Sequence, residues 1–491
     1  MEKIITESLR FADEHGRTRL FNGMNIDDKG LNSPVFAYNL DEDFFKKYRA
    51  NGFNIIRLAV TWQNLEPEMY HYNEAYLQSI DRIFALAEQY GVYILLDMHQ
   101  DIYSANDGKS VGDGAPQWAA LTDGARPRMP IFVWADGYFF GKWVHRSFDH
   151  FWNNDFVRGV GLQDRYCDLW KMLARRYGDS PALFGFDLMN EPFPGSKSKK
   201  MFLRLVANVA KNVLTSRKID RARMVKALLR GDTAGMLDCV GGDVIRDIME
   251  KIDALEADFD LKYYSPFLNK TTAAIREVTP NGIIMMEQSY LCNSGIRQSV
   301  PPITVNGERE PLQCFGPHSY DIMVDTPLYQ YANASRVKAF FTEMRNTQLR
   351  LEVPVVVGEW GGCSDNTDTS WFPHAYELLA FFDENQWGQM YWNYHGDDMD
   401  APLMAMLSRP HPVAVAGKII HYSYNRGDGI FELCYEAETA GETLIYLPKP
   451  MASLNGADYT VAEAYENGAC LLSIPSQPGK NTITVHLEQN A

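Results

Sequence analysis

Eight apolar runs recur along the first four fifths of the chain, and segments with helical spacing separate several of them. The runs are rich in Val, Ile, Leu, Phe and Met without polar alternation, which is typical of strands buried on both faces of a parallel sheet. They cover residues 21–26, 53–60, 92–98, 183–191, 283–288, 314–320, 353–360 and 390–395. Eight such strands with right-handed connections predict an α/β fold, a (β/α)8 TIM barrel.

Helical spacing is clearest between the first runs. Residues 41–51 are charged and helix-like, and Gly52 follows as a stop signal. Residues 76–90 repeat apolar side chains at the spacing of one helix face and end before Gly91. This alternation of strand and helix supports the barrel prediction.

Two connections are too long for a minimal barrel. The first covers about residues 102–166 and is rich in aromatic residues, and the second covers about residues 193–264 and is helix-like. Apolar residues that repeat near one helix face of the second are Leu203, Val206, Val209 and Val213. Since barrel enzymes carry function in such loops, either insertion could shape a lid or an acceptor groove. An outer subdomain with its own small core is the alternative.

The pattern changes after residues 409–412, where helical spacing disappears. Short apolar runs between Gly, Pro and Asn turns predict strands. The predicted strands are residues 431–437, 443–447, 459–464, 471–474 and 482–487. We therefore expect a barrel over residues 1–410 and an antiparallel β-sandwich over residues 411–491. Packing against the barrel is its expected role, with sugar or partner binding as the alternative.

The bulk composition narrows the class of protein. The formal net charge of −16 makes nucleic acid or an anionic membrane surface a poor partner by bulk electrostatics. The seven cysteines contain no C-x-x-C pair and predict neither a disulfide nor a zinc framework. Aromatic residues make up 13%, and such an excess fits a cleft in which rings stack on sugars, although a large core explains most of it.

No apolar run approaches the roughly 18 residues of a membrane span. The first residues lack the long apolar segment of a secretory signal, so a cytoplasmic location is expected, or a secreted one if a signal was removed. The sequence indicates no metal and no cofactor, since it lacks H-E-x-x-H, a Walker loop and a G-x-S-x-G elbow. It does not indicate an oligomeric state.

Polar residues end or interrupt the apolar runs at the same relative position. These residues are Arg57, His99, Asn190, Glu191, His318, Tyr320, Glu359 and Trp392. A single polar residue in a strand is commonly a satisfied buried group. Because inward-facing strand ends of a barrel converge on one centre, the set together predicts an active site.

Two strand-end glutamates predict glycoside hydrolysis. A glycosidic bond needs an acid at its leaving oxygen and a nucleophile on the opposite face of the sugar. Glu191 is predicted to be the acid/base and Glu359 the nucleophile, and a separation of about 5–5.5 Å would give retention of configuration. Arg57 and Tyr320 are expected to hold Glu359 ionised.

The remaining polar residues are expected to bind the sugar. Asn190 is placed for the 2-hydroxyl, a contact that strengthens at the transition state. Trp392 could supply a stacking floor, and His99 and Asp101 would bind other hydroxyls.

These motifs resemble glycoside hydrolase family 5, whose members are retaining (β/α)8 enzymes. The family's acid/base motif is matched by Asn190-Glu191-Pro192 and its nucleophile by Glu359 in the segment 358–362, Gly-Glu-Trp-Gly-Gly. The resemblance covers nearly the whole chain. Other family positions are matched by Arg57, His99, His318, Tyr320 and Trp392.

A narrower similarity is to the endoglycoceramidase group. Residues 97–101, Asp-Met-His-Gln-Asp, resemble that group's third strand end, where the His and Asp bind sugar, and Lys29 in the segment 25–30 is implied as a further hydroxyl contact. Residues 286–288, which include Gln288, and residues 409–417 also fit. The resemblance implies cleavage of a glycan from a ceramide, or of a related glycoside with an apolar aglycone.

Three other functions remain open. An intracellular β-glucosidase for small or steryl glucosides would share the catalytic residues, and so would an endo-β-glucanase for polysaccharides. A catalytically inactive barrel that binds sugars or partners is a different class. It need not keep both glutamates together with Arg57 and Tyr320.

Overall fold

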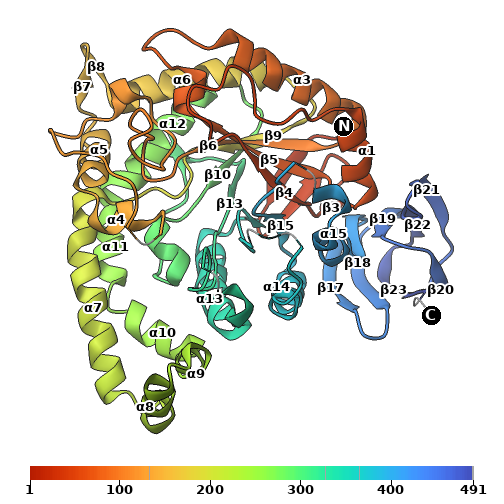
Figure 1. Ribbon diagram of the computed structural model, residues 1–491. Coiled ribbons are helices and arrows are strands. Elements are labelled where there is room, and N and C mark those ends of the chain that lie inside the picture. Colours follow the sequence, from red (N-terminus) through yellow and green to blue (C-terminus); the bar gives the residue numbers. More distant parts are fainter. Residues whose placement is uncertain (132, 327, 364, 366, 397, 489–491) are drawn as a thin grey trace.

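The computed structural model describes residues 1–131, 133–326, 328–363, 365, 367–396 and 398–488 (Figure 1). Its centre is a parallel eight-stranded barrel, which confirms the predicted fold class. The strands are β4 (Asn22–Asp27), β5 (Ile55–Thr61), β6 (Tyr93–His99), β9 (Leu183–Asp187), β10 (Ile283–Met286), β13 (Gln313–Phe315), β14 (Val356–Val357) and β15 (Gly388–Tyr391). They pair in the order β13-β10-β9-β6-β5-β4-β15-β14, and parallel bridges between Phe315 and Val355 and between His318 and Glu359 close the ring.

The strands are buried on both faces, as their apolar sequences require. Every residue of β5 and β6 is buried. Several strands end earlier than predicted, however. β9 ends at Asp187, before Glu191, whose φ of 41° lies in the left-handed region and cannot continue a strand. Most of the predicted site residues therefore lie on the loops just beyond the strand ends, whereas Arg57 lies within β5 and His99 ends β6.

Helices pack around the barrel after most strands. They are α1 (Glu42–Ala50), α2 (Trp62–Leu65), α3 (Glu74–Tyr90), α6 (Leu162–Tyr177), α12 (Ser265–Arg276), α13 (Ala334–Leu351), α14 (Phe372–Glu384) and α15 (Pro402–Leu407). Asp41 caps α1 by accepting a hydrogen bond from Phe44 N, and Gly91 ends α3 with a φ of 67°. Between β10 and β13, a 3-10 helix η4 (Tyr290–Ser294) and a hairpin of β11 (Thr304–Val305) and β12 (Glu308–Arg309) replace the helix of the regular repeat.

The first insertion packs largely into the barrel core. It contains η1 (Gln117–Ala119), α4 (Asp136–Phe140), α5 (Lys142–Trp152) and a hairpin of β7 (Phe156–Val157) and β8 (Val160–Gly161). Aromatic side chains such as Tyr138, Phe148 and Phe151 belong to the main hydrophobic cluster. Much of the aromatic excess therefore fills the core.

The second insertion is helical, as its spacing indicates. It contains η2 (Gly195–Lys197), α7 (Ser198–Thr215), α8 (Arg221–Arg230), α9 (Thr233–Asp238), α10 (Gly242–Met249), α11 (Asp253–Phe259) and a π-helical turn η3 (Asp260–Tyr264) that leads into α12. Ile219, Val244 and Ile248 form a small core of its own. Helix α7 extends away from the barrel towards α8 and α9, and α10 returns to pack against α13 (Figure 1).

The chain after residue 410 forms two packed antiparallel sheets. One contains β16 (His411–Val415), β19 (Gly441–Leu447), β22 (Cys470–Ser476) and β21 (Thr460–Ala464), and the other contains β17 (Lys418–Asn425), β18 (Ile430–Ala437), β23 (Gly479–Leu487) and β20 (Met451–Asn455). Buried residues of both sheets, among them Phe431, Leu433, Ile445 and Leu472, form one hydrophobic cluster. The β-sandwich is therefore present, with β16, β17 and β20 in addition to the predicted strands.

The N-terminal strands cross the expected division of the chain at residue 410. β1 (Ile4–Glu7), β2 (Arg10–Asp13) and β3 (Thr18–Arg19) extend the first sandwich sheet, because β3 pairs with β16. Ile4 and Phe11 also pack against the barrel strands. The strands within the first 19 residues thus share a sheet with the C-terminal region, although they lie on the other side of residue 410 in the sequence.

Candidate active site

Glu191 and Glu359 lie beyond the carboxyl ends of β9 and β14 and face one cavity. One carboxylate oxygen of each, together with a ring nitrogen of His318, lie within 4.8 Å of one another. Both side chains are buried. The two residues, 168 positions apart in the sequence, therefore meet across a gap that fits a single bond.

Hydrogen bonds to both oxygens fix the Glu359 carboxylate. Arg57 Nη1 donates to Oε1 at 2.8 Å, and the Tyr320 hydroxyl donates to Oε2 at 2.7 Å. His318 Nδ1 lies 3.5 Å from Oε2. The group is thereby oriented without losing access to the cavity.

Glu191 has different surroundings. Its Oε1 accepts hydrogen bonds from His318 Nδ1 at 3.1 Å and from Asn293 Nδ2 at 2.5 Å. Its pKa is raised to about 7, chiefly by burial; the hydrogen bond from His318 opposes this shift, and the charge of Glu359 adds to it. Glu191 can therefore carry a proton near neutral pH, as a general acid must.

Arg57 is the electrostatic centre of the site. Its guanidinium is fully buried. It contacts four carboxylates and two amide oxygens: Asp97 at 3.1 Å, Asp187 at 2.8 Å, Glu287 at 2.6 Å, Glu359 at 2.8 Å, Asn25 at 2.9 Å and Asn190 at 3.0 Å. One planar cation thus ties five barrel strands to the nucleophile candidate.

Glu287 connects this centre to Glu191. Its Oε2 accepts the backbone N–H of Glu191 at 2.7 Å, and its Oε1 lies 3.3 Å from His318 Nε2. Burial opposes ionisation of Glu287, but His318 and Arg57 outweigh it and lower the pKa to about 2. Burial by itself would lower the pKa of His318. The charges of Glu287 and Glu359 outweigh burial and raise the pKa of His318 well above its usual value. A protonated His318 can then donate to Glu191.

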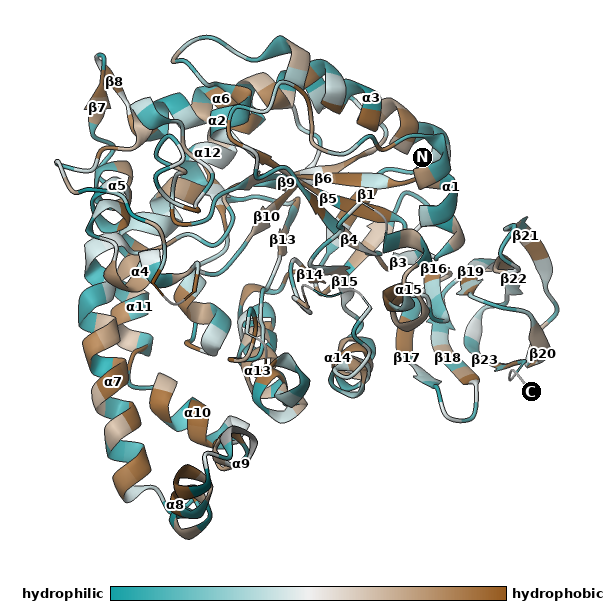
Figure 2. Cartoon of the chain, in the orientation of Figure 1, coloured by the Kyte–Doolittle hydropathy of each residue, from teal (hydrophilic) through white to brown (hydrophobic). Residues whose placement is uncertain are grey.

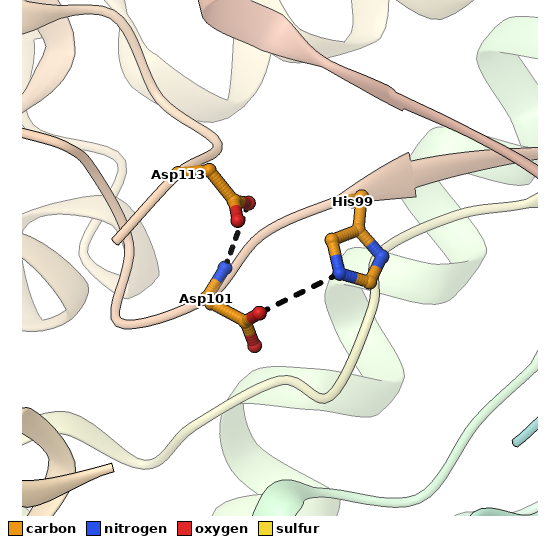
Figure 3. A group of neighbouring side chains, drawn as sticks. All are labelled: His99, Asp101 and Asp113. Carbon is orange, nitrogen blue, oxygen red and sulfur yellow. Dashed lines mark hydrogen bonds and ion pairs between the residues drawn. The ribbon is translucent and has the colours of Figure 1, made fainter. Parts of the chain in front are cut away.

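A second polar group lies beyond the end of β6 (Figure 3). The Asp101 backbone N–H donates to Asp113 Oδ1 at 3.0 Å, and Asp101 Oδ2 accepts from Lys29 Nζ at 2.5 Å and lies 3.7 Å from His99 Nε2. Burial opposes ionisation of Asp101, but Lys29 and His99 lower its pKa to about 2. Burial and the charge of Asp101 raise the pKa of Asp113 to about 7. This arrangement presents charged donors and acceptors that can bind hydroxyl groups.

Trp392 completes this polar group. Its ring stacks on His99 with centroids 5.2 Å apart and an interplanar angle of 13°. Lys29 Nζ lies 4.4 Å from the Trp392 ring centroid. The rest of the indole faces the cavity, where a sugar ring can stack on it.

The cavity has a volume of about 650 Å³ and two chemically distinct ends. The polar end is lined by Lys29, His99, Asp101, Asn190, Glu191, Tyr320, Glu359 and Trp392. The other end is lined mainly by apolar side chains from both insertions and η4, including Phe139, Met201, Phe202, Leu205, Ile252 and Leu291. Both insertions therefore contribute side chains to the cavity wall, in addition to the side chains that they bury elsewhere.

Three of the predicted site residues, Arg57, His318 and Gln288, do not line this cavity. Arg57 and His318 lie behind the two glutamates and act on their carboxylates. Gln288 is buried and donates to Asn293 Oδ1 at 2.9 Å and to the carbonyl of His318 at 2.7 Å. In the structure these side chains position the residues that face the cavity, and a direct contact with substrate stays a prediction.

Sequence reasoning missed several residues of the site. Asn293, which contacts Glu191, lies in η4, and nothing in its local pattern marks it. Asp113 lies in an insertion whose path cannot be inferred from spacing. Glu287, Asp97 and Asp187 had a weak signal, because each is a carboxylate in or directly after an apolar run.

Within the described ranges, three clusters of Asp, Glu and His side chains could supply the ligands of a metal ion. They are His99, Asp101 and Asp113; Glu191, His318 and Glu359; and Asp97, Asp187 and Glu287. The first group already contacts Lys29 and the third surrounds Arg57. These protein cations compensate the negative charge there. The expectation that the protein uses no metal stays a prediction.

Models of known protein families match both regions of the chain, the barrel and the sandwich. The model described as Cellulase (glycosyl hydrolase family 5) matches residues 13–225 and 263–398. The model of the glycoside hydrolase family 5 C-terminal domain matches residues 409–489. Together these matches cover most of the barrel and nearly all of the sandwich.

Individual relatives bear names from glycolipid hydrolysis. The chain is 32% identical to "Endoglycoceramidase" from Hydra vulgaris over 42% of its length and 43% of that protein, so it spans less than half of this relative. It is 25% identical to "Endoglycoceramidase I" from Rhodococcus hoagii over 87% of its length and 75% of that protein. Endo-glycoceramidase II from Rhodococcus sp., solved as a ganglioside GM3 complex, has the same fold, with a TM-score of 0.74 and 24% identity over 98% of this chain and all of the other.

Proposed function

This chain belongs to glycosyl hydrolase family 5 and is a glycoside hydrolase, and we propose that it cleaves the β-glycosidic bond of a glycolipid with retention of configuration. Glu359 is the nucleophile and Glu191 the acid/base. The observation that carries this proposal is the single cavity in which two glutamates at a polar end adjoin an apolar end. A substrate with a sugar head and an apolar aglycone fits that division.

Two displacements account for the geometry. Glu359 attacks the anomeric carbon and forms a glycosyl ester, while the bond to the aglycone oxygen breaks and this oxygen takes the proton of Glu191. A water molecule then gives its proton to Glu191 and attacks the same carbon, which releases the sugar and frees the Glu359 carboxylate. The approach of the two carboxylates within 4.8 Å supports this scheme, since inverting enzymes need a wider gap for water.

The electrostatics support a change of role for Glu191 between these steps. The charge of Glu359 helps raise the pKa of Glu191 in the free enzyme. Ester formation removes that charge, and the pKa of Glu191 then falls. The residue is thus an acid in the first step and a base in the second.

The apolar end of the cavity favours a lipid aglycone over a polysaccharide. A polysaccharide has sugars on both sides of the bond and requires hydroxyl-binding groups on both sides. Phe139, Met201, Phe202 and Leu205 offer none. Ceramide and sterol both fit this description, and the relatives named as endoglycoceramidases favour ceramide.

The stereochemical course tests the mechanism. We expect that proton NMR of a hydrolysis started with an aryl β-glucoside will show the β-anomer of the sugar first, before mutarotation. An α-anomer as the first product would contradict the proposal. A substrate panel of glycosphingolipids, steryl glucosides, aryl glucosides and cellulose tests the aglycone, and the highest kcat/KM on cellulose would overturn the lipid assignment.

Activity should fall at high pH as Glu191 loses its proton. Because the pKa of Glu191 is raised to about 7, kcat/KM for an aryl glucoside with a poor leaving group should decline above about pH 7. An aryl glucoside whose leaving group needs no proton serves as the control and should keep its kcat/KM in the same range. An equal decline for both substrates would assign the basic limb to another group.

The apolar end should matter only for lipid substrates. Replacing Phe202 by Ser removes a ring that packs on Phe139 with centroids 5.5 Å apart and lines the cavity. We expect kcat/KM for a glycosylceramide to fall roughly 10-fold or more, with that for a small aryl glucoside little changed. Phe156→Ser, at an exposed hairpin outside the cavity, is the matched control. Equal losses on both substrates would contradict a lipid-binding role.

A further inference from the structure

Helix α7 carries apolar side chains on two opposite faces. On the inner face, Met201 and Leu205 line the cavity. On the outer face, Leu203, Val206 and Leu214 are 70%, 51% and 73% exposed. Their spacing places them in one stripe, since residues three, four and seven apart share a helix face. Burial explains the apolar residues on the inner face of α7, but it does not explain those on the outer face.

Neighbouring elements also expose apolar side chains. On α8, Val225, Leu228 and Leu229 are exposed, the last of them to 82%. On α4, the exposed Phe140 contacts Phe202 of α7 with ring centroids 5.8 Å apart. In Figure 2, hydrophobic residues recur along α7 and α8, the part of the chain that projects from the barrel.

The same segment concentrates positive charge. Eleven of the residues 197–230 are Lys or Arg and only Asp220 is acidic, in a chain with a net charge of −16. Lys218 and Arg223 pair with Asp247 and Asp238. Lys200, Arg204 and Lys211 are exposed, and within the described ranges they form no ion pair with a carboxylate. They lie beside the outer stripe by helical spacing.

We propose that the outer face of α7 and α8 binds the surface of an anionic lipid bilayer. Amphipathic helices of this kind bury their apolar residues at the headgroup boundary while Lys and Arg contact anionic headgroups. No helix in the described part of the chain is long and apolar enough to cross a membrane, so the contact is with the surface. The net charge of −16 disfavours an anionic surface by bulk electrostatics, but charges more than about 8 Å away are largely screened at physiological salt, so the basic residues of this segment dominate at the contact.

Other partners fit the surface less well. A second copy of the same face would bring like charges together. Nucleic acid would use the basic residues but leave the exposed Leu and Val side chains in water. An acidic, apolar protein groove is the remaining alternative, and the absence of vesicle binding would favour it.

Membrane binding by this face has a consequence for substrate access. Because α7 also lines the apolar end of the cavity, the bilayer would lie on the other side of one helix from the proposed aglycone site. This consequence rests on the proposed function, whereas the binding itself does not.

The test uses the full chain and vesicles that contain no glycolipid. We expect cosedimentation with phosphatidylcholine vesicles that contain about 30 mole per cent phosphatidylserine, at least roughly tenfold stronger than with phosphatidylcholine alone and reversed by high salt. Two triple variants should each lose binding by roughly tenfold or more: L203Q/V206Q/L214Q and K200Q/R204Q/K211Q. Gln preserves helix propensity at these positions.

The double variant I420Q/V461Q, at exposed apolar positions of the sandwich, is the matched control and should bind like the unmodified chain. All variants should hydrolyse a soluble aryl β-glucoside at the unmodified rate, which shows that they are folded. Lack of binding to the anionic vesicles, or unchanged binding of both triple variants, would overturn the proposal. Vesicle binding without hydrolysis of any glycolipid would leave it standing and reject the proposed substrate instead.

Discussion

Replacing Glu359 by Gln is expected to lower kcat for an aryl β-glucoside on the order of 10⁴-fold or more, equivalent to about 5.5 kcal/mol or more of barrier. Gln keeps the size of the side chain but is a poor nucleophile, so the glycosyl ester cannot form. The hydrogen bonds from Arg57 and Tyr320 would meet a neutral amide. Steady-state and single-turnover rates measure the loss.

A matched control and a rescue make this prediction specific. Glu352→Gln changes an exposed glutamate shortly before β14 and should leave kcat unchanged. Glu359→Gly opens space at the anomeric carbon, and added azide should then restore turnover and give a glycosyl azide of inverted configuration. Activity of the Gln variant near that of the unmodified enzyme would remove Glu359 from the role of nucleophile.

Replacing Arg57 is expected to affect both stability and catalysis. Arg57→Met leaves four buried carboxylates without their shared cation and should destabilise the fold by about 3–5 kcal/mol. Arg57→Lys keeps the charge, but one ammonium cannot reproduce the planar set of contacts with Asp187, Glu287 and Glu359. We expect kcat to fall roughly 100-fold or more in the Lys variant, because Glu359, the proposed nucleophile, is no longer held in position. Thermal unfolding and kcat are the measurements.

Arg409 provides the comparison for this prediction. It is also buried and makes two hydrogen bonds with Asp383, at 2.5 and 2.6 Å, away from the cavity. Arg409→Lys should lower the unfolding temperature without lowering kcat. If Arg57→Lys likewise lost only stability, Arg57 would be a structural residue without a positioning role in catalysis.

The residues of the site were predictable to different degrees. Glu191 and Glu359 stand out because a charged residue directly after a buried strand is costly unless it has a function or a partner. The sequence could not show that Arg57 contacts four carboxylates, because two of these, Asp97 and Glu287, meet it only through strand order and inward orientation. Asn293 and Asp113 come from irregular segments, whose paths depend on what they pack against.

The pattern of apolar and polar residues by itself determined the barrel, the sandwich and the strand ends that carry the two glutamates, since periodicity is local and burial of a strand or helix face repeats at a known interval. Tertiary structure alone decided which face of each element is covered. It placed the first three strands in the C-terminal sheet, and it turned Leu203 and Val206 outward while Met201 and Leu205 faced the cavity. The physical reason is that an apolar residue has the same preference for burial wherever it lies, and only the packing of distant segments determines whether that preference is met.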